Sequence, residues 1–80
     1  MKIIISDHAK ERIKIYNLTE NAVKEIVKKP REIVEGYEGR LIAQEGINEH
    51  ILRVVYTKQG EEVRVITVYP AKKERYRRKK

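Results

Sequence analysis

The chain has 80 residues, a length that predicts one domain, residues 1–80, with a thin hydrophobic core. It contains no cysteine, which excludes disulfides and thiolate zinc sites, and its two histidines alone do not favour a metal site. No apolar run approaches the roughly 18 residues that span a bilayer, so we expect a cytoplasmic protein without membrane contact and without a cofactor. Charged residues make up 39% of the chain, a composition typical of thermophile proteins.

The first predicted elements are a strand and a helix. Residues 2–5, Lys-Ile-Ile-Ile, form a β-branched run that indicates a short buried strand. Ser6 or Asp7 is suited to cap a helix that runs to about Ile15. Asn17 is a plausible stop, because asparagine tolerates the left-handed conformation that ends many helices.

A second helix follows directly. Thr19 is its expected N-cap, and the spacing of Val23, Ile26 and Val27 gives it one apolar face. Lys28-Lys29-Pro30 indicates its end, because basic residues favour a helix C-terminus and proline cannot continue the helix. The two helices are therefore predicted to form a hairpin.

From Glu32 the apolar period changes from helical to twofold, which indicates strands. Four strands are predicted, at 32–38, 40–44, 50–57 and 61–69. Gly39 is the expected turn between the first two, and 45–49 the expected loop before the third. Pro70 is predicted to end the last strand, and 71–77 to form a short terminal helix. The order β-α-α-β-β-β-β-α predicts an α+β fold in which two N-terminal helices pack on an antiparallel sheet.

The positive charge is concentrated at the end of the chain. Residues 70–80 carry seven basic side chains and one acid, and so hold +6 of the net charge of +7. A local positive block attracts phosphate backbones and gains affinity through the release of counterions. The alternative is a solvated tail. We expect 72–77 to form the rim of a nucleic-acid site and 78–80 to remain loose.

Histidine and arginine side chains supply the first candidates for chemistry. His8 and Arg12 have i, i+4 spacing, which puts an imidazole beside a guanidinium on one helix face, an arrangement suited to a base. The alternative is that His8 only caps the helix. Arg40, Arg53 and Arg64 stand singly among apolar strand residues. Each either marks the solvated face of the sheet or points into a basic concavity.

Tyrosines supply the second set of candidates. Tyr56, Tyr69 and Tyr76 are expected to be the aromatic residues near the basic segment, where each could stack on a base or donate a phenolic proton. Tyr16 and Tyr37 are interpreted as core or rim residues.

Several motifs together resemble a known family. They are the opening Ser6-x-His8-Ala9-x-x-Arg12, the helix end at 28–30, the strand at 52–56 and the closing segment 65–76. This constellation is similar to a domain-of-unknown-function family related to the BrnT toxins and, more distantly, to the RelE/ParE superfamily of toxin–antitoxin modules. The resemblance covers nearly the whole chain and implies a RelE-like fold.

The resemblance also implies a function and roles for residues. It implies a metal-independent endoribonuclease that acts on RNA, for example on the ribosome, and that an antitoxin protein neutralises. In such an enzyme the catalytic residues would be His8, Arg53, Arg64 and Tyr76, with His8 or a strand glutamate as base and the arginines as phosphate clamps. The nucleic-acid-binding residues would be Arg12, Tyr69, Lys72, Lys73, Arg75 and Arg77.

Two other classes of function fit the same residues. One is a non-catalytic nucleic-acid-binding module, and the other is a protein-interaction domain whose basic tail grips an acidic partner. The chain could be a monomer, or a homodimer formed through an exposed strand edge.

Overall fold

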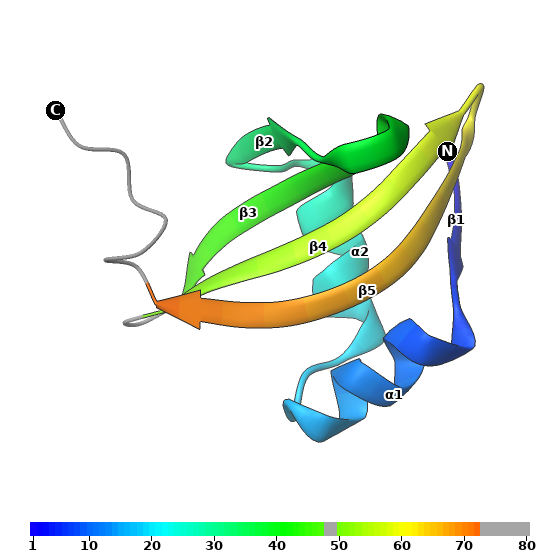
Figure 1. Ribbon diagram of the computed structural model, residues 1–80. Helices are drawn as coiled ribbons and strands as arrows, with labels where there is room; N and C mark the ends of the chain where they lie inside the picture. The colour runs from blue at the N-terminus through cyan, green and yellow to red at the C-terminus, as the bar shows by residue number, and fades with distance from the viewer. Residues whose placement is uncertain (48–49, 73–80) are drawn as a thin grey trace, which may run out of the picture.

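The computed structural model describes residues 1–47 and 50–72, in which two helices pack against one face of a five-stranded sheet (Figure 1). In chain order the elements are β1 (Lys2–Ile5), α1 (Asp7–Ile15), α2 (Glu20–Lys28), β2 (Glu32–Glu35), the 3₁₀-helix η1 (Tyr37–Gly39), β3 (Leu41–Ile47), β4 (His50–Gln59) and β5 (Glu62–Lys72). The predicted α+β class is confirmed.

The sheet is mixed, so the prediction of an antiparallel sheet is wrong. Its strand order is β1-β5-β4-β3-β2, and β1 runs parallel to β5 while the other neighbours are antiparallel. The helical hairpin carries the chain from one edge of the sheet to the other before β2 begins. The meander then returns strand by strand until β5 reaches β1. Parallel pairing needs a long connection of this kind, because a tight turn joins only antiparallel strands.

Ser6 fixes the start of α1 and also joins it to the sheet. Its hydroxyl oxygen accepts a hydrogen bond from the backbone N–H of Ala9 at 3.1 Å, as an N-cap residue does. The same hydroxyl donates to the carbonyl oxygen of Ile66 in β5 at 3.0 Å. Thr19 caps α2 in the same way, accepting from Ala22 N–H at 3.1 Å. Both predicted caps are therefore confirmed.

Asn17 ends α1 as predicted. Its φ of 60° lies in the left-handed region, its N–H donates to the Lys14 carbonyl at 3.0 Å, and the N–H of Leu18 donates to the Ile13 carbonyl at 2.8 Å. These two bonds form a Schellman motif, which satisfies carbonyl groups that the end of a helix leaves without partners. The chain can therefore reverse within residues 16–19 and place α2 on the same face of the sheet as α1.

The core lies between the helices and the sheet. Along β4, Leu52, Val54 and Tyr56 are buried toward the helices, beside the buried Val63, Val65 and Val68 of β5. The helices contribute the remaining members of the cluster from their apolar faces, together with Ile5 of β1 and Ala43 of β3. The helical members are Ala9, Ile13, Val23, Ile26 and Val27.

Two predicted boundaries at β2 and β3 are wrong. The strand predicted at 32–38 ends at Glu35, because η1 already turns the chain, although the turn at Gly39 (φ 75°) is as expected. The loop predicted at 45–49 begins too early, since β3 runs to Ile47. Pairing of β3 with β4, as far as Ile47 opposite His50, outweighs the loop-like composition of this stretch.

Pro70 does not end β5. It lies opposite Leu52, and the strand continues to Lys72, so the prediction of a helix starting at Ala71 is wrong. Proline lacks an N–H and is tolerated in a strand where no neighbouring strand needs that donor. β1 ends at Ile5, opposite Val65, and within the described residues no strand pairs with β5 beyond it on that side. The rest of the predicted helix, at 73–77, and the loose end expected at 78–80 lie outside the described residues.

Candidate functional site

One row of four polar side chains crosses the face of the sheet that the helices leave open. Arg53 stands between the buried Leu52 and Val54, so the alternation of β4 directs its side chain away from the helices. The strand register places Gln44 and Tyr69 directly opposite Arg53 on either side. Glu32 of β2 lies opposite Gln44 in turn. We call Glu32, Gln44, Arg53 and Tyr69 the polar row.

Hydrogen bonds join the polar row from end to end. Gln44 Nε2 donates to Glu32 Oε1 at 3.2 Å, and Gln44 Oε1 accepts from Arg53 Nε at 2.8 Å. Arg53 Nη1 donates to the Tyr69 hydroxyl at 2.9 Å, and the guanidinium carbon lies 5.6 Å from the centre of the Tyr69 ring. The amide of Gln44 and the phenol of Tyr69 therefore hold the guanidinium from both sides.

The centre of the polar row is largely withdrawn from water. Gln44 is 5% exposed and Arg53 8% exposed, although no helix covers this face. A buried charge is costly unless other groups hydrogen-bond to it. Among the described residues every fully buried side-chain nitrogen and oxygen has a hydrogen-bond partner. The row is thus a satisfied network that fixes the position of one cation on the sheet.

An apolar row runs beside the polar row on the same face. The register aligns Val34 of β2, Ile42 of β3, Val55 of β4 and Thr67 of β5. All four are half-buried, so this part of the sheet presents apolar surface that the helices do not cover. Partly exposed apolar surface around a charged group is typical of a binding site.

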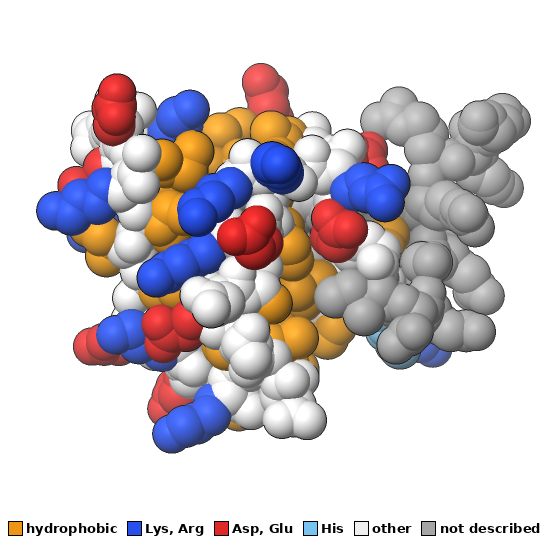
Figure 2. Space-filling model, turned by 180° about the vertical axis from the view of Figure 1, so that it is seen from behind, with side chains coloured by type: hydrophobic (Ala, Val, Ile, Leu, Met, Phe, Trp, Pro, Cys, Tyr) orange, Lys and Arg blue, Asp and Glu red, His pale blue; other side chains and the backbone are white. Residues whose placement is uncertain are grey.

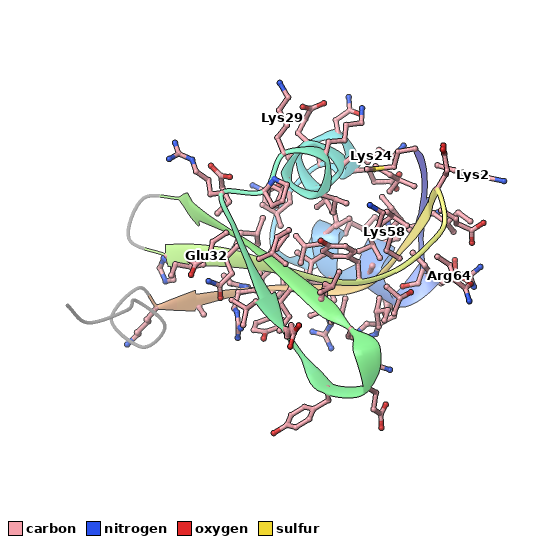
Figure 3. The ribbon with its side chains drawn as sticks, turned by 90° about the horizontal axis from the view of Figure 1, so that it is seen from above. Lys2, Lys24, Lys29, Glu32, Lys58 and Arg64 are labelled. Carbon is pink, nitrogen blue, oxygen red and sulfur yellow. The ribbon has the colours of Figure 1, made fainter. Side chains whose placement is uncertain are left out.

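Members of both rows line a groove of ≈ 590 Å³, namely Arg53 and Tyr69 of the polar row and Val34, Ile42 and Val55 of the apolar row. Its lining comes from β2, η1, β3, β4 and β5. The lining residues are Val34, Glu35, Gly36, Tyr37, Arg40, Ile42, Arg53, Val55 and Tyr69. Figure 3 shows the segment between β2 and β3, which contains η1, projecting from the sheet on the side away from the helices. This segment supplies Tyr37 and Arg40 to one wall of the groove.

The structure brings together two of the predicted site residues, Arg53 and Tyr69. Arg64 lies at the other end of the sheet from Glu32 (Figure 3), where its guanidinium pairs with Glu62 at 3.1 Å. Lys72 is exposed at the last position of β5, three residues after Tyr69.

His8 and Arg12 lie on α1, which packs on the covered side of the sheet, and His8 is exposed there. The sheet therefore separates the backbone of α1 from the polar row. The other predicted site residues, Lys73, Arg75, Tyr76 and Arg77, lie outside the described residues.

The helix side of the molecule carries charged side chains of both signs. Figure 2 shows this side, where acidic and basic side chains are interspersed with hydrophobic surface between them. Such a mixture gives phosphate groups little net attraction. The open face, with Arg40 and Arg53 in one groove, is the better candidate.

Neither a metal cluster nor a membrane helix is present in the described part of the chain. Among residues 1–47 and 50–72, no three His, Asp or Glu side chains lie close enough together to hold a metal ion. Over the same residues, neither helix has the length and hydrophobicity needed to cross a bilayer.

Fold and site together define a small α+β domain with a hydrogen-bonded polar row on an open sheet face. The chain belongs to the family described as "Domain of unknown function (DUF4258)", whose model matches residues 5–70. The resemblance to a family of unknown function is confirmed at this level, and the matched range contains the whole polar row. Comparisons with curated proteins and with solved structures gave no match.

Proposed function

We propose that this chain is a toxin-like, RNA-directed protein of the toxin–antitoxin type, with a RelE-like fold, and that it cleaves RNA without a metal ion on the open face of its sheet. The observation that carries the proposal is Arg53, held between Gln44 and Tyr69 in the floor of a groove. A guanidinium fixed in advance is suited to a phosphate, because it stabilises developing negative charge without reorganising.

The chemistry requires an attacking oxygen, a base, an acid and a cation. The RNA 2′-oxygen attacks phosphorus and the 5′-oxygen leaves, which yields a 2′,3′-cyclic phosphate and a free 5′-hydroxyl. Arg53 would hold the phosphate, and Glu35, which lines the same groove, would take the proton from the 2′-hydroxyl. Tyr69 would protonate the leaving oxygen. Its hydroxyl accepts from Arg53, so its own hydrogen remains available to donate.

The remaining roles rest on the sequence. Arg64, His8 and Tyr76 stay candidates for catalysis, and Arg12 and the basic segment 70–80 stay candidates for RNA binding. The segment follows Tyr69 directly, so the net charge of +6 in the sequence begins beside the polar row. An antitoxin that neutralised the protein would have to block this open face.

One observation favours a second function, RNA binding without cleavage. In the described part of the chain, no histidine lines the groove, and His8 lies on a helix that packs against the other side of the sheet. Among the described residues that line the groove, Glu35 would then be the only carboxylate that could serve as a base. If it does not, the same surface would hold RNA without cutting it.

An RNA-cleavage assay in EDTA separates these functions. We expect single-stranded RNA, free or on ribosomes, to be cut to products with cyclic phosphate ends. Tyr69→Phe and Glu35→Gln should each slow the cut by about 100-fold, the usual contribution of a general acid or base. Lys29→Ala is the control, because Lys29 is exposed at the end of α2 on the covered side (Figure 3).

The outcomes of this assay are distinct. If the wild type binds RNA but leaves it intact, the binding module replaces the nuclease. If the wild type neither binds nor cuts, both functions are wrong. Variants Arg53→Ala, His8→Ala, Arg64→Ala and Tyr76→Phe test the remaining assignments, and circular dichroism should show that each variant is folded.

A further inference from the structure

Tyr37 is an aromatic side chain that the fold leaves in water. It is 90% exposed, whereas the other exposed large hydrophobic side chains of the described residues are 51–62% exposed. A tyrosine usually buries its ring, because the ring is one of the largest apolar surfaces a residue can remove from water. Its exposure is therefore unexpected if the residue serves only the fold.

The backbone that carries Tyr37 is a tight and costly turn. Glu38 follows it with φ 56° and ψ 43°, and Gly39 has φ 75°. A left-handed conformation is unfavourable for glutamate, because its Cβ crowds the following carbonyl oxygen. Strain of this kind persists where the surrounding structure imposes it, and it is often found at ligand contacts.

Two hydrogen bonds lock this turn in place. The N–H of Gly36 donates to the Arg40 carbonyl at 2.8 Å, and the N–H of Arg40 donates to the Tyr37 carbonyl at 3.1 Å. The backbone of Tyr37 is therefore fixed relative to β2 and β3. Because the backbone that carries the ring is already ordered, binding to the ring does not pay the entropic cost of ordering this turn.

Tyr37 shares its groove with the groups proposed to hold a phosphate. Arg40 and Arg53 line the same groove, with Ile42 and Val55 between the walls. A nucleotide has a charged phosphate and a flat base. The groove offers arginines for the phosphate and the ring of Tyr37 for the base. Unpaired bases commonly stack on tyrosine rings in RNA-binding proteins, whereas bases in a duplex are not accessible for such stacking.

We propose that Tyr37 is a stacking platform for one unpaired base of an RNA strand whose phosphate lies at Arg53. This inference rests on the proposed binding of RNA and adds the side chain that would select an unpaired base over a duplex. Protein recognition is the other use of an exposed ring. The two arginines in the groove favour a polyanion over an apolar peptide.

Binding to 2′-O-methyl RNA oligonucleotides tests the stacking role, because these cannot be cleaved through the 2′-oxygen. We expect Tyr37→Ala to weaken binding roughly ten-fold, within the usual range for one stacked base, and Tyr37→Phe to bind like the wild type. The slope of affinity against salt should not change in Tyr37→Ala, since no phosphate contact is lost. Ile15→Ala, at an exposed position on α1, is the control.

A series of oligonucleotides with one abasic position each locates the stacked base. In the wild type, one abasic position should cost about as much as Tyr37→Ala. In Tyr37→Ala the same position should cost nothing further, because the ring and the base form one interaction.

The results distinguish this inference from the function on which it rests. If the wild type binds RNA and Arg53→Ala weakens binding, but Tyr37→Ala binds normally, the stacking role is wrong while RNA binding stands, and a protein contact becomes the use of the ring. Additive effects of Tyr37→Ala and every abasic position would also overturn it. If the wild type does not bind RNA, the proposed function itself fails.

Discussion

The two faces of the sheet are built from the same strands and have different composition. On β4, Leu52 and Val54 face the helices and are 3% and 0% exposed, while Arg53 between them faces the open side. The covered face contains aliphatic residues and Tyr56, whereas the open face has a charged residue hydrogen-bonded across four strands. Alternation along one strand therefore lets neighbouring residues serve the core and a candidate site.

The difference predicts which substitutions affect folding and which affect binding. Stability comes mainly from the covered face, because removing apolar surface from water is the dominant favourable term in folding. The open face adds less, because hydrogen bonds there replace hydrogen bonds to water. Substitutions on the covered face should therefore lower stability more than RNA binding, and substitutions on the open face should lower RNA binding more than stability.

The largest effect is expected for Ile13→Ala on α1. Ile13 is 4% exposed and packs in the core, so the change should lower the free energy of unfolding by about 3 kcal/mol. In a domain of this size each kcal/mol lowers Tm by roughly 4–8 °C. Thermal melts followed by circular dichroism measure the change.

Ile15→Ala is a matched control for that change, since it has the same chemistry on the same helix but affects a side chain that is 62% exposed. Its effect should stay within about 0.5 kcal/mol. Equal losses in the two variants would mean that helix propensity, and not the packing of the covered face, sets the stability.

Gln44→Glu tests the open face with a change of charge and almost none of shape. The new carboxylate would still accept from Arg53 Nε, but it would neutralise the guanidinium and repel Glu32. We expect RNA binding to weaken about ten-fold, or about 1.4 kcal/mol, with a smaller loss of stability.

Gln59→Glu adds the same charge at the exposed end of β4, outside the polar row, and is the control for Gln44→Glu. Filter binding at several salt concentrations measures both variants. Equal weakening by both would show that only net charge matters and that the polar row has no special role.

The helices could be predicted from the sequence, because their signals are local. As caps and stop, Ser6, Asn17 and Thr19 act on backbone groups within five residues of themselves, so these roles do not depend on the rest of the fold. The second hydrogen bond of Ser6, to Ile66 of β5, is not local and was not predicted. The parallel pairing of Ile3 with Val63 joins residues sixty positions apart. No local pattern encodes such a pairing, and the prediction of an antiparallel sheet was wrong for this reason.

The residues of the candidate site also divide into those that the sequence could predict and those that only the fold reveals. Arg53 and Tyr69 could be named from their residue types, as a cation and an aromatic residue beside a basic segment. Gln44 was missed, because its role appears only when two strand pairings place it between Glu32 and Arg53. Tyr37 was interpreted as a core or rim residue. The sequence pattern of strand, turn and strand does not say whether a tyrosine in the turn is buried or exposed. The structure shows that Tyr37 is exposed and lines the groove.

The turn at η1 allows a smaller test, on the rim of the open face. Glu38→Asn should raise the free energy of unfolding by about 0.5–1 kcal/mol, because asparagine tolerates the left-handed conformation and Asn-Gly suits a turn with two positive φ values. Urea unfolding measures the gain. Glu61→Asn removes the same charge beside another turn, at a residue without positive φ, and should give no gain. A gain from both variants would assign the effect to charge.

The smallest expected effect concerns Tyr56, a tyrosine of the covered face that is 4% exposed. Burial raises the pKa of its phenol above the ordinary value of 10.0, because the phenolate would lose its hydration. The folded state then holds this proton more tightly than the unfolded state. The stability linked to the proton is fully present below about pH 10 and is lost as the pH rises through the folded-state pKa.

Tyr56→Phe removes the ionisable group and nearly preserves the ring. We therefore expect the urea midpoint of the wild type to fall more steeply than that of Tyr56→Phe between about pH 8 and about pH 11. Tyr37→Phe is the matched control, made at a tyrosine that is 90% exposed, and its curve should follow that of the wild type. Parallel curves for the wild type and Tyr56→Phe would show that the phenol reaches water through the covered face. The covered face would then exclude water less completely at this end of β4 than the burial of Tyr56 indicates.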